Sequence, residues 1–146
     1  MARGHGRKLR LCTMLEEVAD SLPGRIDRLK CLHLASELVP LLRSIHDFEE
    51  TAVFPLFRCA ARCDLASGCS IRRLKSEHIE DEAYADELSE VLMHAGHGQA
   101  ICNPDAFGFM LRGFFTTLRR HVAFEQSFFL PSLARCDWSK SQGPDV

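Results

Sequence analysis

The chain has 146 residues, of which 18 are basic and 20 acidic, so its formal net charge is −2. This length fits one domain whose core is large enough to fold without disulfide or metal staples. The near balance of charge gives no electrostatic reason to expect nucleic acid or an anionic membrane as a partner.

Other features of the composition indicate a soluble, cytoplasmic protein. No segment approaches the ~20 uncharged apolar residues that a membrane helix requires, and the first residues lack the apolar stretch of a secretory signal. The seven cysteines, an odd number, fit free thiols in a reducing compartment better than a disulfide framework. The basic cluster at residues 3–10 is interpreted as a solvated helix start rather than a contact arm.

The first two predicted helices cover residues 7–22 and 26–61. A proline and a glycine follow the first helix and end it. Pro40 and Pro55 lie inside the second helix, where each lacks a backbone N–H and should kink the helix or divide it.

The last two predicted helices cover residues 71–95 and 104–136. Ser70 is the expected N-cap of the third helix. Asn103 is the expected N-cap of the fourth, and a proline is its first residue. No segment has the alternating pattern of a strand.

These elements indicate a single domain over residues 1–138, and residues 139–146 are predicted to be a disordered tail. Four amphipathic helices with short connections favour an all-α fold, an up-down-up-down four-helix bundle. Metal sites in such bundles are built from side chains that point inward from facing helices.

A histidine followed four residues later by a glutamate occurs twice on these helices, as His46 with Glu50 and as His121 with Glu125. At this spacing both side chains lie on one face of a helix, about 6 Å apart. In both copies that face is otherwise apolar. Because an unpaired carboxylate on a core face is costly, these residues require a partner, and a metal ion is the candidate.

Helical phase, at about 100° per residue, adds a third histidine. His78 shares its stripe with apolar residues of the third helix and is predicted to face the core. Glu82 is about 40° from it by the same geometry and could approach the site. Glu80 and Asp81 are predicted to be partly or wholly solvated.

Other histidines are excluded on the same grounds. His33 repeats the histidine–glutamate spacing but lies about 220° from His46 on a straight helix, so it points away from the core. His94 lies about 160° from His78, and His97 falls in a glycine-containing loop. All three are expected at the surface.

Glu49 competes with Glu50 for the inward position on the second helix. The second copy decides in favour of Glu50, because the residue three after His121 is Phe124 and only the residue four after it is acidic. Three inward histidines with two inward glutamates predict a metal centre. Imidazole and carboxylate suit iron, manganese or zinc, and two carboxylates that can bridge favour a dinuclear centre.

This pattern resembles the hemerythrin family, and specifically its branch with the HHE cation-binding domain. The resemblance covers nearly the whole chain, including the phenylalanine and proline that follow each histidine–glutamate pair. It implies a cofactor of two iron ions, linked by an oxo or hydroxo bridge, in preference to manganese or zinc. The metal ligands it implies are His5, His46, His78 and His121 as terminal ligands, and Glu50 and Glu125 as bridges.

The sequence departs from the oxygen-carrying hemerythrins at two positions. Those proteins have a second histidine one turn from the first on the third helix, whereas Leu74 and Glu82 stand on either side of His78 here. They also have an aspartate five residues after the last histidine, where this chain has Gln126. Fewer protein ligands leave open or water-filled positions on the iron, which favours reaction or sensing over oxygen transport.

Cys59 and Cys63 lie one turn apart near the end of the second helix, and Cys69 follows in the next loop. They could form a redox site or a second metal site. The interpretation as small, half-buried thiols is preferred, because no CxxC spacing or accompanying histidine is present.

The leading functional hypothesis is therefore a cytoplasmic non-haem di-iron protein that binds or reacts with oxygen, nitric oxide or peroxide. Its role would be sensing, or protection of iron and redox chemistry. The alternative is an iron-sensing or iron-binding interaction module without catalysis, whose output is a protein partner. A third hypothesis is a bundle with no metal function.

Overall fold

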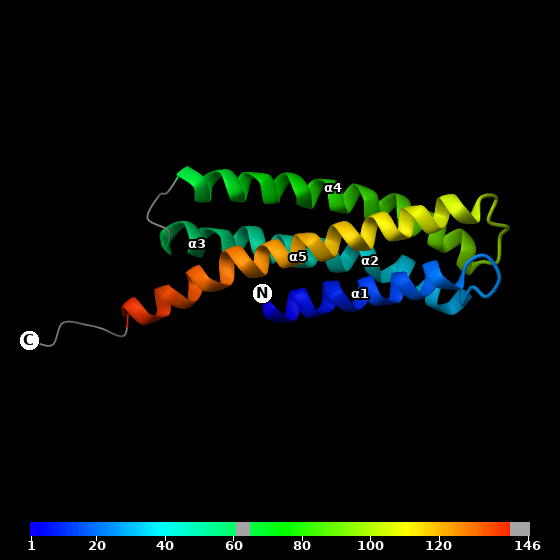
Figure 1. The fold of residues 1–146 in the computed structure, drawn as a ribbon, viewed down its shortest axis with the longest axis horizontal. Coiled ribbons are helices and arrows are strands. Elements are labelled where there is room, and N and C mark those ends of the chain that lie inside the picture. The colour runs from blue at the N-terminus through cyan, green and yellow to red at the C-terminus, as the bar shows by residue number, and fades with distance from the viewer. Residues whose placement is uncertain (61–64, 141–146) are drawn as a thin grey trace, which may run out of the picture.

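The computed structural model describes residues 1–60 and 65–140, without the side chains of residues 59–69, 130 and 132–140. Its four long helices are α1 (Ala2–Ser21), α2 (Arg28–Phe48), α4 (Leu65–Gly96) and α5 (Pro104–Lys140). Two short segments, η1 (Glu49–Val53) and α3 (Phe54–Ala60), continue α2 in the same direction (Figure 1). The described residues contain no strand, and the predicted up-down-up-down bundle is confirmed.

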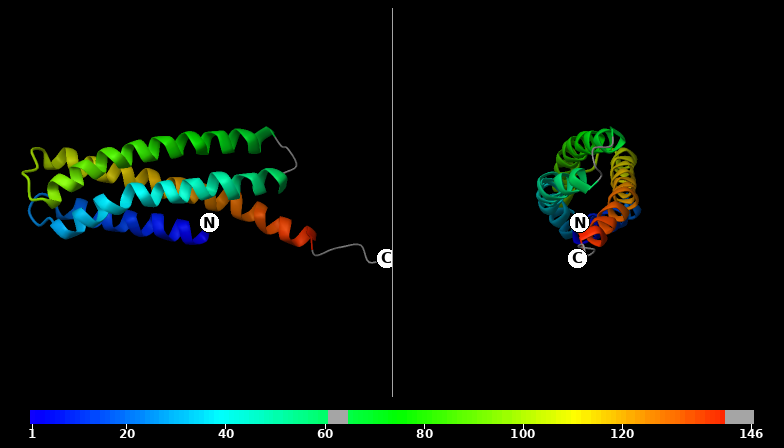
Figure 2. Two further views of the ribbon diagram at one scale, coloured as in Figure 1. Left: turned by 180° about the vertical axis from the view of Figure 1, so that it is seen from behind. Right: turned by 90° about the vertical axis from the view of Figure 1, so that its left-hand side faces the viewer.

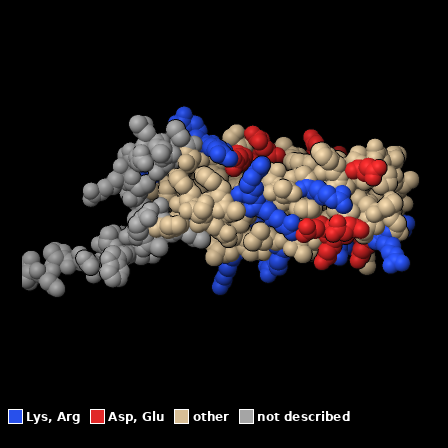
Figure 3. All heavy atoms as spheres, viewed as in Figure 1, with Lys and Arg blue, Asp and Glu red and all other residues tan. Residues whose placement is uncertain are grey.

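The helices pack as two close antiparallel pairs, α1 with α5 and α2 with α4. Seen along its length, the bundle is a ring of helices around a shared interior (Figure 2). Basic and acidic side chains are interspersed on the face seen in Figure 3, in keeping with the balanced composition. Among the described residues, no helix is both long and apolar enough to cross a membrane.

The apolar core consists of two clusters. The larger joins α1, α2, α4 and α5 and extends toward the loops that connect α1 to α2 and α4 to α5. The smaller is rich in aromatic rings and lies around Phe54, Phe57 and Phe129. Buried polar side chains such as His46 and His78 lie between the two clusters.

The caps show where sequence signals set the helix boundaries. The Asp27 side chain accepts a hydrogen bond from the Lys30 backbone N–H at 3.0 Å, and α2 begins there. Asn103 caps α5 as predicted, since its Oδ1 accepts from the Ala106 backbone N–H at 2.9 Å. The predicted cap at Ser70 is wrong, because α4 begins at Leu65 and places this serine inside the helix.

Other boundaries extend beyond the prediction. α1 begins at Ala2 rather than residue 7, because its first two turns carry side chains that are buried in the bundle. α5 continues to Lys140 rather than ending near residue 136. The predicted tail at 139–146 stays a prediction, and residues 141–146 lie outside the described residues.

The two prolines of the second predicted helix have different effects. Pro40 lies inside α2, which continues past it. Before Pro55, which has no N–H to donate, the chain forms the π-helical turn η1, in which the Phe54 N–H bonds to the Glu49 carbonyl five residues back. This turn carries Glu49 and Glu50, so the local change of helix type falls within the predicted site.

Candidate metal centre

Six side chains with metal-ligating atoms meet between the two apolar clusters, and none is more than 4% exposed. They form three overlapping groups in which the ligand atoms all lie within 4.8 Å of one another. The groups are His46, Glu49 and His78; His78, His121 and Glu125; and His5, Glu49 and Glu125. Each of the four long helices contributes at least one donor, with Glu49 supplied by η1.

Glu125 is the most central of these donors. Its Oε2 accepts a hydrogen bond from His5 Nε2 at 2.9 Å. Its Oε1 lies 3.3 Å from His121 Nε2 and 3.8 Å from His78 Nε2. One carboxylate therefore approaches imidazoles from three helices.

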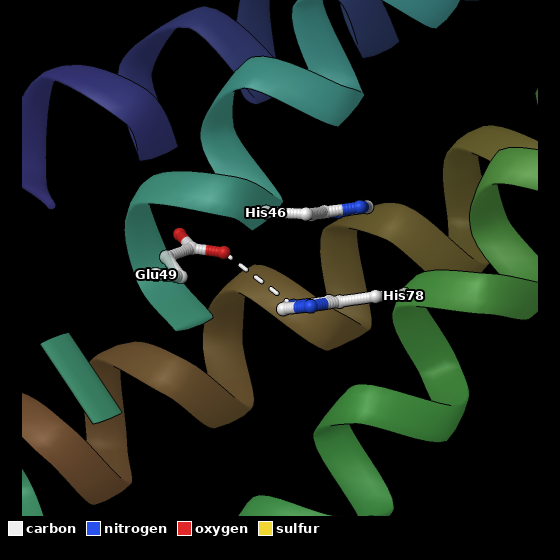
Figure 4. Close-up of side chains that lie close together, drawn as sticks. All are labelled: His46, Glu49 and His78. Carbon is white, nitrogen blue, oxygen red and sulfur yellow. Dashed lines mark ion pairs between the residues drawn. The ribbon is translucent and has the colours of Figure 1, made fainter. Parts of the chain in front are cut away.

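Glu49, from η1, approaches two of the same imidazoles, those of His5 and His78. Its Oε2 lies 3.5 Å from His78 Nε2, across the space between η1 and α4 (Figure 4). The rings of His46 and His78 are stacked, with centroids 3.9 Å apart and planes within 5°. This stacking places two imidazole edges beside the Glu49 carboxylate.

The histidines on α2, α4 and α5 each pair their outer ring nitrogen with a carboxylate. His46 Nδ1 lies 2.8 Å from Glu82 Oε1, His78 Nδ1 lies 2.9 Å from Glu50 Oε1, and His121 Nδ1 lies 2.8 Å from Asp81 Oδ2. A carboxylate in this position receives the Nδ1 proton, fixes the ring orientation and leaves Nε2 as the inward lone pair. This arrangement is typical of metal-ligating histidines.

The inward atoms lack protein partners. Among the described residues, the buried atoms without a hydrogen bond include the Nε2 atoms of His46, His78 and His121 and the Oε1 atoms of Glu49 and Glu125. A buried polar atom left unpaired costs about 1–3 kcal/mol, and native structures contain few of them. Five such atoms facing one interior region fit a cation, which would accept all of their lone pairs.

Burial and mutual repulsion set the protonation of the cluster. Burial, followed by the charges of His78 and Lys8, lowers the pKa of His46 to about 2. Burial also opposes the charged form of His78, but the nearby carboxylates of Glu125, Glu49 and Glu50 outweigh this effect and raise its pKa to about 9. The pKa of Glu125 lies well below its ordinary value, because the nearby rings of His121, His5 and His78 outweigh the effect of burial.

Lys8 is the member of this region that the sequence analysis missed. Its side chain is 0% exposed, and its Nζ lies 3.0 Å from Glu49 Oε2 and 3.5 Å from Glu125 Oε2. The interpretation of residues 3–10 as a solvated helix start is therefore wrong for Lys8, while His5 lies in the interior, where its predicted role as a ligand requires it to be. The spacing offered a signal, because the two residues lie three apart on one helix face.

The structure brings together five of the six predicted ligands, His5, His46, His78, His121 and Glu125. The choice of Glu50 over Glu49 for the inward position was wrong, whereas the metal-binding role of Glu50 stays a prediction. Glu49 is fully buried among the donors, while the Glu50 side chain is 31% exposed, pairs with Lys75 at 2.9 Å and supports His78 from outside. The reason is rotation of the helix: Glu49 continues the buried stripe of Leu38, Leu42 and Ile45, whereas Glu50 lies at its edge.

Other predictions for polar residues have mixed outcomes. Glu82 does approach the site, through His46. Asp81 was expected in solvent but is only 5% exposed, because it faces His121 across the α4–α5 contact. His33, His94 and His97 are exposed, as predicted. The side chains of Cys59, Cys63 and Cys69 lie outside the described residues, so their interpretation stays a prediction.

Comparison with known families agrees with this geometry. The sequence matches the family model of the hemerythrin HHE cation-binding domain over residues 1–133, a range that contains every donor in the cluster. No curated protein and no solved structure gives a significant match. Because the family match spans most of the chain, this protein belongs to the hemerythrin HHE cation-binding domain family.

Proposed function

We propose that this protein is a cytoplasmic, non-haem iron protein of the hemerythrin-like type that binds or reacts with oxygen, nitric oxide or peroxide. Its role would be sensing, or protection of iron and redox chemistry. The observation that carries the proposal is the set of unpartnered inward atoms on His46, His78, His121, Glu49 and Glu125. Mixed imidazole and carboxylate donors of this kind suit iron.

The chain's own residues would hold and orient the metal. His46, His78 and His121 offer Nε2, and their outer carboxylates keep those lone pairs inward. The di-iron prediction assigned the bridging role to Glu50 and Glu125, and the two glutamates that are buried here, Glu49 and Glu125, could each bridge two ions in the same way. When bound by these residues with a position left open, iron would supply the capacity to bind small oxygen- or nitrogen-containing ligands and to change oxidation state.

The surroundings favour a small ligand over a large one. Phe54 stacks near His78, with ring centroids 5.7 Å apart, and its partner Phe129 is 0% exposed, so water is excluded from one end of the centre. Between α4 and α5, a pocket of about 190 Å³ is lined by Asp81, Thr117 and His121, among others. A diatomic molecule or peroxide could reach the centre along this pocket.

A second candidate function is an iron-sensing module without catalysis that acts through a protein partner. The observation that favours it is the origin of the donors, which come from every long helix of the bundle. A metal bound to all of them would stabilise the folded state over the unfolded chain. Metal occupancy would then control the surface that a partner meets.

The experiment that tests both begins with protein purified without a chelator. Metal content is measured by mass spectrometry, and the ferrous protein is then mixed anaerobically with nitric oxide while its visible and electron paramagnetic resonance spectra are recorded. His121→Ala is the loss variant and His33→Ala, at an exposed position, is the matched control. Iron that His121→Ala loses and His33→Ala keeps, with a spectrum that changes on nitric oxide, supports the reactive function.

The alternatives give different results. Iron that binds and stabilises the fold but whose spectrum does not respond to nitric oxide, oxygen or peroxide favours the sensing module. A protein that contains no iron, takes up none on reconstitution and melts at the same temperature with and without it would contradict both functions.

A further inference from the structure

The Lys8 ammonium lies where the buried carboxylates converge. It contacts Glu49 and Glu125, the two acids of the group that also contains His5. All four side chains are at most 2% exposed. An ammonium with these neighbours sits among the same oxygens that a metal ion in the His5 group would bind.

The two oxygens of each glutamate have different surroundings. The Oε2 atoms of Glu49 and Glu125 are the ones that Lys8 contacts, and Glu125 Oε2 also accepts from His5. The Oε1 atoms of both glutamates have no hydrogen-bond partner, like the Nε2 atoms of His46, His78 and His121. Glu125 therefore turns one oxygen to His5 and Lys8 and the other to His78 and His121. Glu49 is not divided in this way, because its Oε2 lies near both Lys8 and His78 and its Oε1 lies 3.9 Å from His5 Nε2. We call the region around the unpartnered Nε2 atoms of His46, His78 and His121, together with Glu125 Oε1, the free half.

The net charge of the buried groups also favours one metal ion over two. The buried acids around the centre are Glu49, Glu125 and Asp81, and the ammonium is one fixed positive charge beside the two glutamates. A single divalent ion added to the free half, together with the ammonium, balances these three carboxylates. Two divalent ions would add their full charge next to an ammonium that has no access to solvent, and buried like charges are strongly unfavourable.

We propose that Lys8 takes the place of one metal ion, so that the centre holds a single iron tightly, in the half formed by His46, His78 and His121 with one oxygen from each buried glutamate. In this arrangement His5 positions Glu125 through its 2.9 Å hydrogen bond instead of ligating the metal. The inference rests on the proposed function, because it assumes that the free half binds iron.

The test compares iron stoichiometry in the full chain and in Lys8→Met, which removes the charge and keeps the length of an unbranched side chain. Metal-free protein is titrated anaerobically with ferrous iron, and bound iron is counted after desalting. Tight binding of about one iron per chain is expected for the unmodified protein and about two for Lys8→Met, a doubling. Lys30→Met, which removes a lysine paired with Glu17 at the surface, should leave the count unchanged.

Electron paramagnetic resonance supplies an independent readout of the oxidised protein. A single ferric ion gives a high-spin signal, whereas two bridged ferric ions couple and give none. The signal should therefore be strong in the unmodified protein and much weaker in Lys8→Met.

Each outcome has a defined meaning. Two tightly bound irons in the unmodified protein would overturn the proposal and leave the iron function standing, and this arm does not depend on whether Lys8→Met folds. One iron in both proteins would also overturn it, because removing the lysine should open the second half. Absence of iron from both would contradict the proposed function and this inference with it.

Discussion

His5 and Glu125 are 120 residues apart in sequence, yet His5 Nε2 donates to Glu125 Oε2 at 2.9 Å in the middle of the bundle. The contact joins α1 to α5, which is one of the two closest helix pairs. Both side chains are buried, so the bond is protected from solvent. It fastens the first turns of the chain to the helix that supplies two of the clustered donors.

Removal of this bond should loosen α1. His5→Ala leaves the buried Glu125 carboxylate short of one donor, and such a loss costs about 1–3 kcal/mol. We expect the urea midpoint of the metal-free protein to fall accordingly, with an unchanged dependence on urea concentration. Arg7→Ala, an exposed position on the same helix, is the control, and equal midpoints for both variants would contradict the prediction.

Glu49 and Glu50 should differ in their effect on metal binding. Glu49→Ala deletes a buried donor, whereas Glu50→Ala deletes a carboxylate that only orients His78 from outside. Loss of an orienting partner typically costs about 10–100-fold in metal affinity, and loss of the donor itself should cost more. Competition with a coloured chelator gives both affinities. A larger loss for Glu50→Ala would show that Glu50 is the ligand, as predicted from the sequence.

Asp81 should act on the metal through His121. Asp81→Asn keeps the size of the side chain but can present an N–H to His121 Nδ1, which favours the wrong tautomer. We expect about a 10–100-fold loss of iron affinity with little change in the helical content seen by circular dichroism. Glu80→Gln changes a neighbouring exposed acid and should have no such effect.

The metal-free protein should be most stable near neutral pH. The folded-state pKa of His78 is raised to about 9, so its contribution to stability is complete below its unfolded value of 6.5 and is lost as the pH rises to about 9. The pKa of His46 is lowered to about 2, so the unfolded chain takes up the proton first and stability falls as the pH drops below 6.5.

Melting temperatures measured in the presence of a chelator between pH 5 and 9, a range of about four units around neutrality, would show the loss of stability on both the acid and the alkaline side. Replacing His78 with Asn should weaken the decline on the alkaline side. Part of the decline should remain, because Asp81 and Glu125 outweigh the effect of burial on His121 and raise its pKa too. A melting temperature that rises steadily from pH 6.5 to 9 would contradict the assignment of a raised pKa to His78.

The pocket between α4 and α5 should control access of small molecules. Thr117→Trp places a large ring in a pocket of about 190 Å³ without replacing any of the clustered donors. We expect several-fold slower binding of nitric oxide in stopped-flow measurements, with unchanged iron content. Thr116→Trp, at an exposed position beside it, serves as the control, and equal rates in the two variants would place the entry route elsewhere.

The fold and most of the donors could be predicted because they depend on periodicity within single helices. Apolar stripes identified the inward faces around His46, His78 and His121, and the described structure buries all three. The glycine and proline residues between the apolar stripes marked the loops. The observed helices differ from the predicted ones mainly in where they begin and end. These features can be predicted without knowing how one helix is rotated relative to another.

The errors arose where neighbouring stripes had to be compared. Leu38, Leu42 and Ile45 define a buried face whose next member is Glu49, but the prediction was centred on His46, which lies to one side. Asp81 looked exposed on its own helix and is buried only because α5 brings His121 against it. Lys8 lies on the same helix face as His5 and Leu15, but its charge favoured a position in solvent. Its burial depends on two carboxylates from other helical segments, Glu49 and Glu125, which the sequence of α1 does not reveal.

The origin of the donors in every long helix has a consequence for biosynthesis. A ribosome releases α1 first, and the residues of α5 that complete the centre emerge only after more than a hundred others. Unfinished chains therefore lack His121 and Glu125 and retain only one complete donor group, that of His46, Glu49 and His78. The full set of donors comes together only when synthesis of α5 is complete, so assembly of the whole centre is a late event that requires the finished polypeptide.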